Sequence, residues 1–341
     1  SMPFFGGIEG GGSKSSMIII DENGKCVGES SGPDTNVWQI GATEVSNRIN
    51  KMVIDAKNVA GIPTDQKLAS LGMCLSGGEQ PATNKEMIKT MSELYPLMSE
   101  SLIIKSDTAG SIATACEKGG MVLISGTGSN CSLENEDGST FGCGGWGHMM
   151  GDEGGAYWIS HRAVKYVFDH DDNMDSAPCD PTLVRKMMYK YFKVSDRQGM
   201  LNSLYSDFSK SNFAGFCKVL AVEGCVKKSD ALCLHLFKEA GIVLAKHIIA
   251  LVPKADKAML QRADGLQVVC VGSVWKNWKY IKEAFMETLS SHLQGKVSSI
   301  TLVELNGNSA IGSAVIGAKH ANIPISVDLS KNYRVLYQST I

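Results

Sequence analysis

Two short glycine-rich turns are the part of the sequence best suited to chemistry. Segments 6–14 and 125–130 each place glycines and small hydroxyl residues between two apolar stretches. Glycine lets the backbone come within hydrogen-bonding distance of a bulky anion, and a tight turn directs successive N–H groups toward it. One such turn is weak evidence of function. Two in matching contexts predict a duplicated fold that holds a polyphosphate from both sides.

Hydroxyl and glycine residues at the two turns are the predicted phosphate contacts. Ser13 and Thr127 lie at the tips, where their hydroxyls can face an anion, and Lys14 adds a positive charge. The neighbouring glycines permit a close approach of the backbone, and they are Gly11, Gly12, Gly126 and Gly128.

Two further motif matches are rejected by their context. Residues 7–15 nearly match a P-loop, but the lysine is one position late and 17–20 is predicted as a strand, whereas a P-loop opens a helix. Residues 142–147 fit G-x-G-x-x-G, yet they follow a turn and no predicted strand. A Rossmann dinucleotide site is therefore not expected.

The elements around the turns alternate between strand and helix. Apolar periodicity predicts strands at 4–9, 16–20, 25–29, 68–75 and 102–105, and helices at 40–60 and 84–91. The pattern then restarts with strands at 120–125 and 129–133, helices at 156–169, 181–191, 213–223 and 230–252, and strands at 266–272 and 299–305. We predict an α/β protein with a small domain over 1–117 and a larger one over 118–341 that carries a helical insertion. Whether the last helix returns to the first domain is left open.

Composition limits the class of partner. The 341 residues are 43% hydrophobic and 20% charged, and a formal net charge of −2 gives no reason to expect nucleic acid or an anionic membrane as partner. The ten cysteines contain no C-x-x-C pair, which is typical of reduced thiols in a cytoplasmic protein. No stretch approaches the roughly 18 apolar residues of a membrane span. We expect a cytoplasmic protein with a small-molecule ligand.

Four motifs together resemble those of a known superfamily. They lie at 10–13, 125–130, 269–273 and 309–314. In that order, they resemble the phosphate-1, phosphate-2, adenosine and second connecting motifs of the sugar kinase, Hsp70 and actin superfamily. Segment 142–154, together with 107–115 and 213–217, resembles more specifically the animal N-acetylglucosamine kinase family, within the BadF/BadG/BcrA/BcrD ATPase-like group. The resemblance departs at Ser13, where the family usually has threonine, and after about Ile323.

This resemblance implies a fold and an activity. The expected fold is a two-lobed, duplicated ribonuclease H-like fold of the actin and hexokinase type with a central cleft, assembled as a homodimer. The expected reaction is phosphorylation of the 6-hydroxyl of N-acetyl-D-glucosamine by ATP with Mg²⁺, without a protein-bound metal cluster. A kinase for N-acetylmannosamine or glucose, and a non-kinase ATPase of the same superfamily, remain alternatives.

The resemblance also assigns roles to single residues. It makes Asp107 the catalytic base, although an aspartate between a strand and a helix, like Asp152 before the next helix, can equally be a helix N-cap. Trp146 lies between glycines, which favours a stacking surface for the sugar. The implied sugar contacts are Asn36, Asp107, Ser129, Asn130, Gly145, Trp146, Gly147 and Asp152. The implied adenosine contacts are Ala214, Gly272 and Ser273, the last two also being typical of a strand-to-helix junction.

Overall fold

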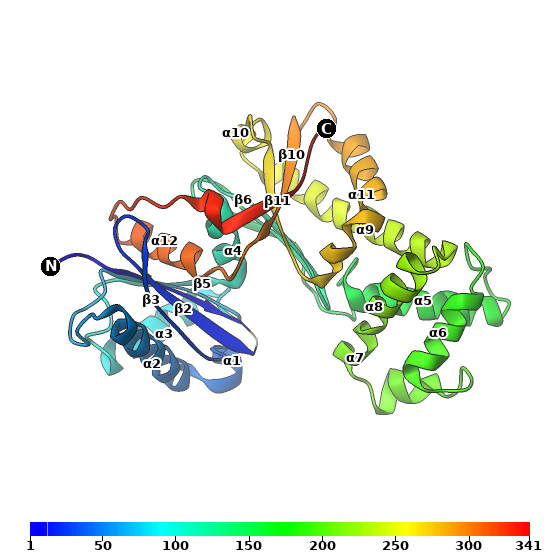
Figure 1. Cartoon of the computed structure of the whole chain (residues 1–341), viewed down its shortest axis with the longest axis horizontal. Coiled ribbons are helices and arrows are strands. Elements are labelled where there is room, and N and C mark those ends of the chain that lie inside the picture. Colours follow the sequence, from blue (N-terminus) through cyan, green and yellow to red (C-terminus); the bar gives the residue numbers. More distant parts are fainter. Residues whose placement is uncertain (12) are drawn as a thin grey trace. The chain divides into compact units, whose positions relative to one another are not determined.

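Two units make up the chain, and each contains a β-sheet with helices packed against it (Figure 1). The computed structural model describes residues 1–11 and 13–341. The first unit comprises Ser1–Gly120 and Leu302–Tyr337, and the second comprises Met121–Thr301 and Gln338–Ile341. Gly12, a predicted phosphate contact, lies outside the described residues.

The first unit contains a mixed sheet of five strands in the order β3-β2-β1-β4-β5. Its strands are β1 (Phe5–Gly10), β2 (Lys14–Ile20), β3 (Cys26–Pro33), β4 (Ser70–Leu75) and β5 (Leu102–Ser106). The first three form an antiparallel meander, whereas β4 runs parallel to β1 and β5 runs parallel to β4. In the parallel part of the sheet, Gly10 pairs with Leu75 and Leu75 pairs with Ser106, so the carboxyl ends of three strands lie together.

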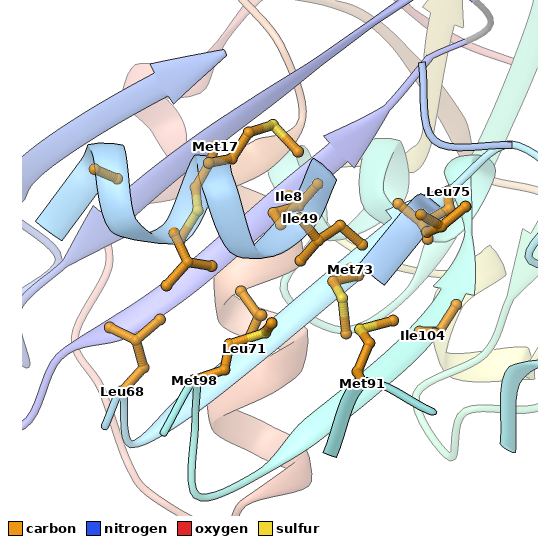
Figure 2. Packing of buried hydrophobic residues seen from close by; sticks show 14 of the residues in the cluster. Ile8, Met17, Ile49, Leu68, Leu71, Met73, Leu75, Met91, Met98 and Ile104 are labelled. Atoms are coloured by element: carbon orange, nitrogen blue, oxygen red, sulfur yellow. The ribbon is translucent and has the colours of Figure 1, made fainter. Parts of the chain in front are cut away.

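Helices cover both faces of this sheet. They are α1 (Val37–Ile40), α2 (Ala42–Ala60), α3 (Pro81–Leu94), α4 (Asp107–Ala115) and α12 (Ala310–His320), with a short 3-10 turn, η5 (Leu329–Asn332). Because side chains alternate along a strand, Ile8 packs toward α2 and α3, where Ile49 and Met91 lie in the same apolar cluster (Figure 2). Phe5 points to the other face and packs with Ala314 of α12.

Helix α12 packs directly against the backbone of β1 and β4. A Cβ atom on Gly7 would lie 2.1 Å from the Ala310 carbonyl oxygen, and one on Gly72 would lie 1.9 Å from the Ser313 carbonyl oxygen. The helix can approach the strands this closely only because both positions lack a side chain. The glycines therefore determine how closely the helix approaches the sheet.

The second unit repeats the strand order of the first. Its sheet has the order β11-β10-β9-β6-β7-β8, so that β8-β7-β6-β9-β10 corresponds to β3-β2-β1-β4-β5. The strands are β6 (Gly120–Ser125), β7 (Ser129–Glu134), β8 (Thr140–Gly144), β9 (Leu266–Val271), β10 (Ser299–Leu305) and β11 (Tyr333–Thr340). The division between the units falls after Gly120, the first residue of β6, and within β10 and β11.

Helices account for most of the second unit. They are α5 (Ala156–Asp171), α6 (Thr182–Phe192), α7 (Lys210–Ala214), α8 (Phe216–Val219), α9 (Ala231–Leu251), α10 (Lys257–Leu260) and α11 (Trp278–Leu293). Two π-helical segments lie before α7 and after α8, at Asn202–Ser206 and Leu220–Val226, and 3-10 turns lie at Val252–Lys254 and Ser273–Asn277. No helix within residues 1–11 and 13–341 has both the length and the hydropathy needed to cross a membrane.

The structure confirms the predicted α/β class and its duplicated strand pattern, and it corrects three local predictions. The single helix expected at 213–223 is instead α7, α8 and a π-helical segment, with Gly215 between the two helices. Segment 142–147 does follow a strand, because it continues β8, but that strand is antiparallel to β7 and is not followed by the helix of a Rossmann unit. Strand β11 was not predicted.

The contact between α12 and the sheet predicts the effect of adding one methyl group. Gly72→Ala would place a Cβ against helix backbone, which cannot move aside as a side chain can, so we expect the free energy of unfolding to fall by about 3 kcal/mol. Gly307→Ala is the control, because a Cβ there meets open space. Urea unfolding of both variants measures the difference, and equal stabilities would contradict the packing described.

Candidate active site

The first glycine turn is a tight hairpin between β1 and β2. The Gly11 N–H donates to the Lys14 carbonyl at 2.9 Å, which closes the turn, and both Ser13 and Lys14 are exposed. A Cβ on Gly10 would lie 2.3 Å from Thr35 Oγ1, so the strand end also requires glycine. The Ser13 hydroxyl and the Lys14 side chain thus occupy an exposed tip that an anion can reach.

Asp107 lies at the carboxyl edge of the sheet in the same unit. It directly follows β5, and its Oδ1 accepts from the Thr108 N–H at 3.0 Å while its Oδ2 accepts from the Ser76 hydroxyl at 3.4 Å. The Ser76 N–H donates to the Gly10 carbonyl at 2.9 Å. Ser76 therefore connects the Asp107 carboxylate to the strand end that leads into the first hairpin. The N-cap position of α4 is occupied by Ser106, so Asp107 is not its N-cap.

Asn36 and Trp38 lie next to Ser76. Asn36 Oδ1 caps α1 by accepting from the Trp38 N–H at 3.0 Å, and the Trp38 indole N–H donates to the Gly77 carbonyl at 3.2 Å. A Cβ on Gly77 would lie 2.8 Å from the Trp38 ring and 2.9 Å from Asn36 Oδ1. The indole is 60% exposed. An amide and an exposed aromatic residue therefore lie against Gly77, the residue that follows Ser76.

The second glycine turn is held against the start of α5. The carbonyls of Gly126 and Thr127 accept from the N–H groups of Ala156 and Tyr157 at 2.7 and 3.0 Å. The Ser129 hydroxyl also donates to the Glu153 carbonyl at 2.7 Å. This hairpin and the segment before α5 therefore form one hydrogen-bonded body, with Thr127 at the tip.

Asp152 is buried against the same hairpin. Its φ of 62° is in the left-handed region, which is uncommon for a residue with a side chain. Asp152 Oδ1 accepts from the Ser129 N–H at 3.1 Å, and Oδ2 pairs with Lys210 Nζ at 2.8 Å. The N-cap position of α5 is Gly155. The alternative in which Asp152 caps that helix is therefore wrong.

The segment from Gly144 to Gly154 follows β8 and bends repeatedly. Gly144, Gly145, Gly147 and Gly154 all have positive φ. A Cβ on Gly145 would lie 3.0 Å from the Asn130 side chain, so the Gly145 backbone lies close to that amide. The Trp146 side chain is 76% exposed. Two further predicted sugar contacts are thus adjacent, and Trp146 presents an open aromatic surface.

His148 belongs to an aromatic cluster beside this segment. Its ring centroid lies 5.1 Å from that of Tyr157 and 5.4 Å from that of Phe208. Tyr157 in turn packs with His161 and Phe213. Burial, with Lys165 and Arg162 nearby, lowers the pKa of His161, so that ring stays neutral at pH 7. Because Phe213 belongs to α7, this cluster packs against that helix.

Of the predicted adenosine residues, Gly272 lies against the second hairpin, whereas Ala214 is attached to α5. Gly272 has a φ of 112°, and a Cβ there would lie 2.2 Å from the Ser125 carbonyl oxygen, directly before Gly126. It immediately precedes the 3-10 turn that starts at Ser273, so the strand-to-helix junction is real as well. Ala214 ends α7, and its carbonyl accepts from the Ser160 hydroxyl of α5 at 3.2 Å.

Cys131 of β7 lies opposite Cys143 of β8 in the antiparallel register of these strands. Burial raises the pKa of the Cys131 thiol, and Cys143 beside it raises this pKa further. Among the described residues, no group of three or more His, Cys, Asp and Glu is arranged to hold a metal ion.

Sequence reasoning missed three residues, namely Ser76 and Trp38 in the first unit and Lys210 in the second. Ser76 and Trp38 are each linked by a tertiary hydrogen bond, to Asp107 and Gly77 respectively. Lys210 reaches Asp152 across 58 positions of sequence. A polar residue directly after a buried strand, as Ser76 is after β4, was the one available signal.

Comparison with known proteins identifies the class. Residues 7–317 match the model of the BadF/BadG/BcrA/BcrD ATPase family. The match covers most of the chain, and the protein belongs to that family.

Individual relatives are similar in sequence, and a solved structure is similar in fold. The chain is 24% identical over 318 residues to the N-acetylmuramic acid/N-acetylglucosamine kinase of Clostridium acetobutylicum, covering 92% of this chain and 98% of that protein. It is 29% identical over 181 residues to the N-acetyl-D-glucosamine kinase of Dictyostelium discoideum, a match that spans 51% of this chain and 57% of that protein. The fold is similar to that of the ROK hexokinase from Thermus thermophilus, with a TM-score of 0.57 at 14% identity, over 93% of this chain and 99% of the other.

The contact between Gly128 and Asp152 predicts which glycine of the second hairpin is indispensable. A Cβ on Gly128 would lie 2.4 Å from Asp152 Oδ1, whereas the nearest atom to a Cβ on Gly126 is 3.9 Å away. Gly128→Ala must displace a buried, hydrogen-bonded carboxylate, and we expect it to unfold at a free energy about 1–3 kcal/mol lower than Gly126→Ala. Chemical denaturation of the two variants decides this, and equal values would refute the predicted clash.

Proposed function

We propose that the protein is a kinase that transfers the γ-phosphoryl group of ATP to the 6-hydroxyl of N-acetyl-D-glucosamine, giving N-acetylglucosamine 6-phosphate and ADP. The observation that carries the proposal is the place of Asp107, whose carboxylate lies at the carboxyl edge of β1, β4 and β5 beside the first hairpin. The family membership and the activity named for the Clostridium acetobutylicum relative support the same reaction.

Phosphoryl transfer needs a base for the acceptor proton and donors for the charge on the phosphate. Asp107 takes the proton of the 6-hydroxyl, while the Ser76 hydroxyl keeps its carboxylate oriented. Ser13 and Thr127, with the adjacent glycines and Lys14, contact the phosphates. Ala214, Gly272 and Ser273 flank the adenosine.

The remaining predicted residues bind the sugar. Asn36, Asn130 and Asp152 provide polar groups for its hydroxyls, and the Ser129, Gly145 and Gly147 segments bring backbone groups close. Trp146 and Trp38 offer exposed aromatic faces for the apolar side of the ring or its acetyl methyl group.

ATP would bring Mg²⁺, which prefers phosphate and water oxygens to a cage of protein ligands. The Glu9 carboxylate, near the end of β1, could serve as an outer-sphere contact of this Mg²⁺. Its Oε2 accepts from the Ser309 N–H at 3.0 Å, which holds the group in place. Bound Mg²⁺ would neutralise charge on the transferring phosphate.

We further propose that the enzyme acts in the cytoplasm as a homodimer. The ten cysteines contain no C-x-x-C pair, which is typical of reduced thiols in a reducing compartment. Light scattering of the purified chain measures the assembly directly.

A coupled assay with ATP tests the acceptor. We expect the highest kcat/KM for N-acetylglucosamine among a panel that also contains N-acetylmannosamine, glucose and N-acetylmuramic acid, the last because the Clostridium acetobutylicum relative is named for it. A clear preference for glucose would overturn the proposed acceptor. ATP hydrolysis that no sugar stimulates would favour a non-kinase ATPase.

Replacement of the proposed base tests the mechanism. Asp107→Asn keeps the shape of the side chain and its contact with Ser76 but cannot accept the 6-hydroxyl proton, so kcat should fall by about 10²- to 10⁴-fold with sugar KM changed little. Steady-state kinetics and circular dichroism should therefore show a folded, nearly inactive enzyme. A kcat near that of the wild type would exclude Asp107 as the base.

A further inference from the structure

The ion pair between Lys210 and Asp152 joins two segments that the sequence keeps far apart. Lys210 Nζ lies 2.8 Å from Asp152 Oδ2, and the side chains are 34% and 6% exposed, respectively. A buried carboxylate is costly unless it is paired and hydrogen-bonded. Lys210 supplies the positive charge, and the Ser129 N–H supplies the hydrogen bond to the other oxygen.

These two contacts fix the orientation of the carboxylate. Oδ1 is held toward Ser129 and Oδ2 toward Lys210, and the Gly128 backbone lies so close that a Cβ there would be 2.4 Å from Oδ1. A carboxylate has about four lone-pair positions on two oxygens. Acceptor capacity therefore remains for hydroxyl groups, in directions set by the two contacts.

The helix that carries Lys210 is held in place by several contacts. It is the first residue of α7, where Ser209 caps the helix by accepting from the Asn212 N–H at 3.2 Å. The Tyr191 hydroxyl donates to the Asn212 carbonyl at 2.5 Å, and the Phe213 ring is buried against Tyr157. A cation in the first turn of a helix gains nothing from the helix dipole. The favourable partner of this lysine is Asp152.

We infer that Lys210 is a positioning residue for the sugar acceptor, acting through Asp152. The inference rests on the proposed kinase function and adds a residue to its sugar site. Lys210 holds the Asp152 carboxylate in the orientation that accepts sugar hydroxyls. Loss of Lys210 should therefore weaken sugar binding more than nucleotide binding.

Lys210→Met removes the charge and keeps most of the apolar stem. We expect sugar KM to rise about tenfold or more, because a buried carboxylate loses its partner, while ATP KM stays within about twofold. Lys210→Arg keeps the charge and should recover most of the sugar affinity. The control is Lys227→Met, which breaks a pair of the same 2.8 Å length with Glu223 where both side chains are about half exposed. It should behave as the wild type.

Two results would overturn the inference at this stage. One is a sugar KM for Lys210→Met that equals the sugar KM of the control, Lys227→Met. The other is an equal rise in the KM values for sugar and ATP, since that would indicate general loosening of the unit.

A double-mutant cycle tests whether Lys210 acts through Asp152. Lys210→Gln, Asp152→Asn and the double variant are compared by equilibrium binding of N-acetylglucosamine, using calorimetry on protein shown to be folded by circular dichroism. Asparagine tolerates a left-handed φ, so it preserves the Asp152 backbone. If Lys210 acts only through the carboxylate, adding Lys210→Gln to Asp152→Asn changes the dissociation constant by less than about twofold. Additive losses would refute the inference, because Lys210 would then contact the ligand independently.

The wild-type enzyme separates this inference from the proposed function. If the wild type does not phosphorylate N-acetylglucosamine, the proposed function fails. If it does so and the Lys210 variants match the control, only the role of Lys210 fails.

Discussion

The direct contact between α12 and the backbone of β1 and β4 is the constraint on which the first unit depends. Gly7 and Gly72 leave no side chain between helix and sheet, so the helix backbone packs directly on both strands and constrains their position. The start of the helix is tied to β1 as well, because the Ser309 N–H donates to Glu9 Oε2. The first hairpin follows β1 and Ser76 follows β4, so the positions of both depend on this packing.

The two units share a strand order but support their glycine hairpins differently. The first hairpin closes on itself through Gly11 and Lys14 and leaves its tip exposed. The second is bound to the start of α5 and to the Asp152 carboxylate. Duplication therefore preserved the turn and its topology, while the surroundings that hold each turn diverged.

Much of this arrangement is encoded locally and could be predicted. Most strands and helices follow from apolar periodicity, although β8 and β11 were missed, and glycines between hydroxyl residues mark both turns. The predicted helix at 213–223 failed because its apolar pattern continues through two breaks in the hydrogen-bonding pattern. One lies at Gly215, between α7 and α8, and the other at Leu220, where α8 gives way to a π-helical segment. The partners of Asp152 were not predictable, since no sequence period links it to Ser129 or Lys210. Trp38 was missed for the same reason, because its role depends on the Gly77 carbonyl, a tertiary neighbour.

The attachment of the second hairpin to α5 has a consequence for how a phosphate could be held there. The first two N–H groups of that helix already donate to the Gly126 and Thr127 carbonyls, so their donor capacity is used within the protein. A phosphate at this turn would instead meet the Thr127 hydroxyl, which rotates about a single bond. Such a donor can follow an oxygen as it moves during transfer, whereas a helix terminus offers a fixed cradle suited to a stationary anion.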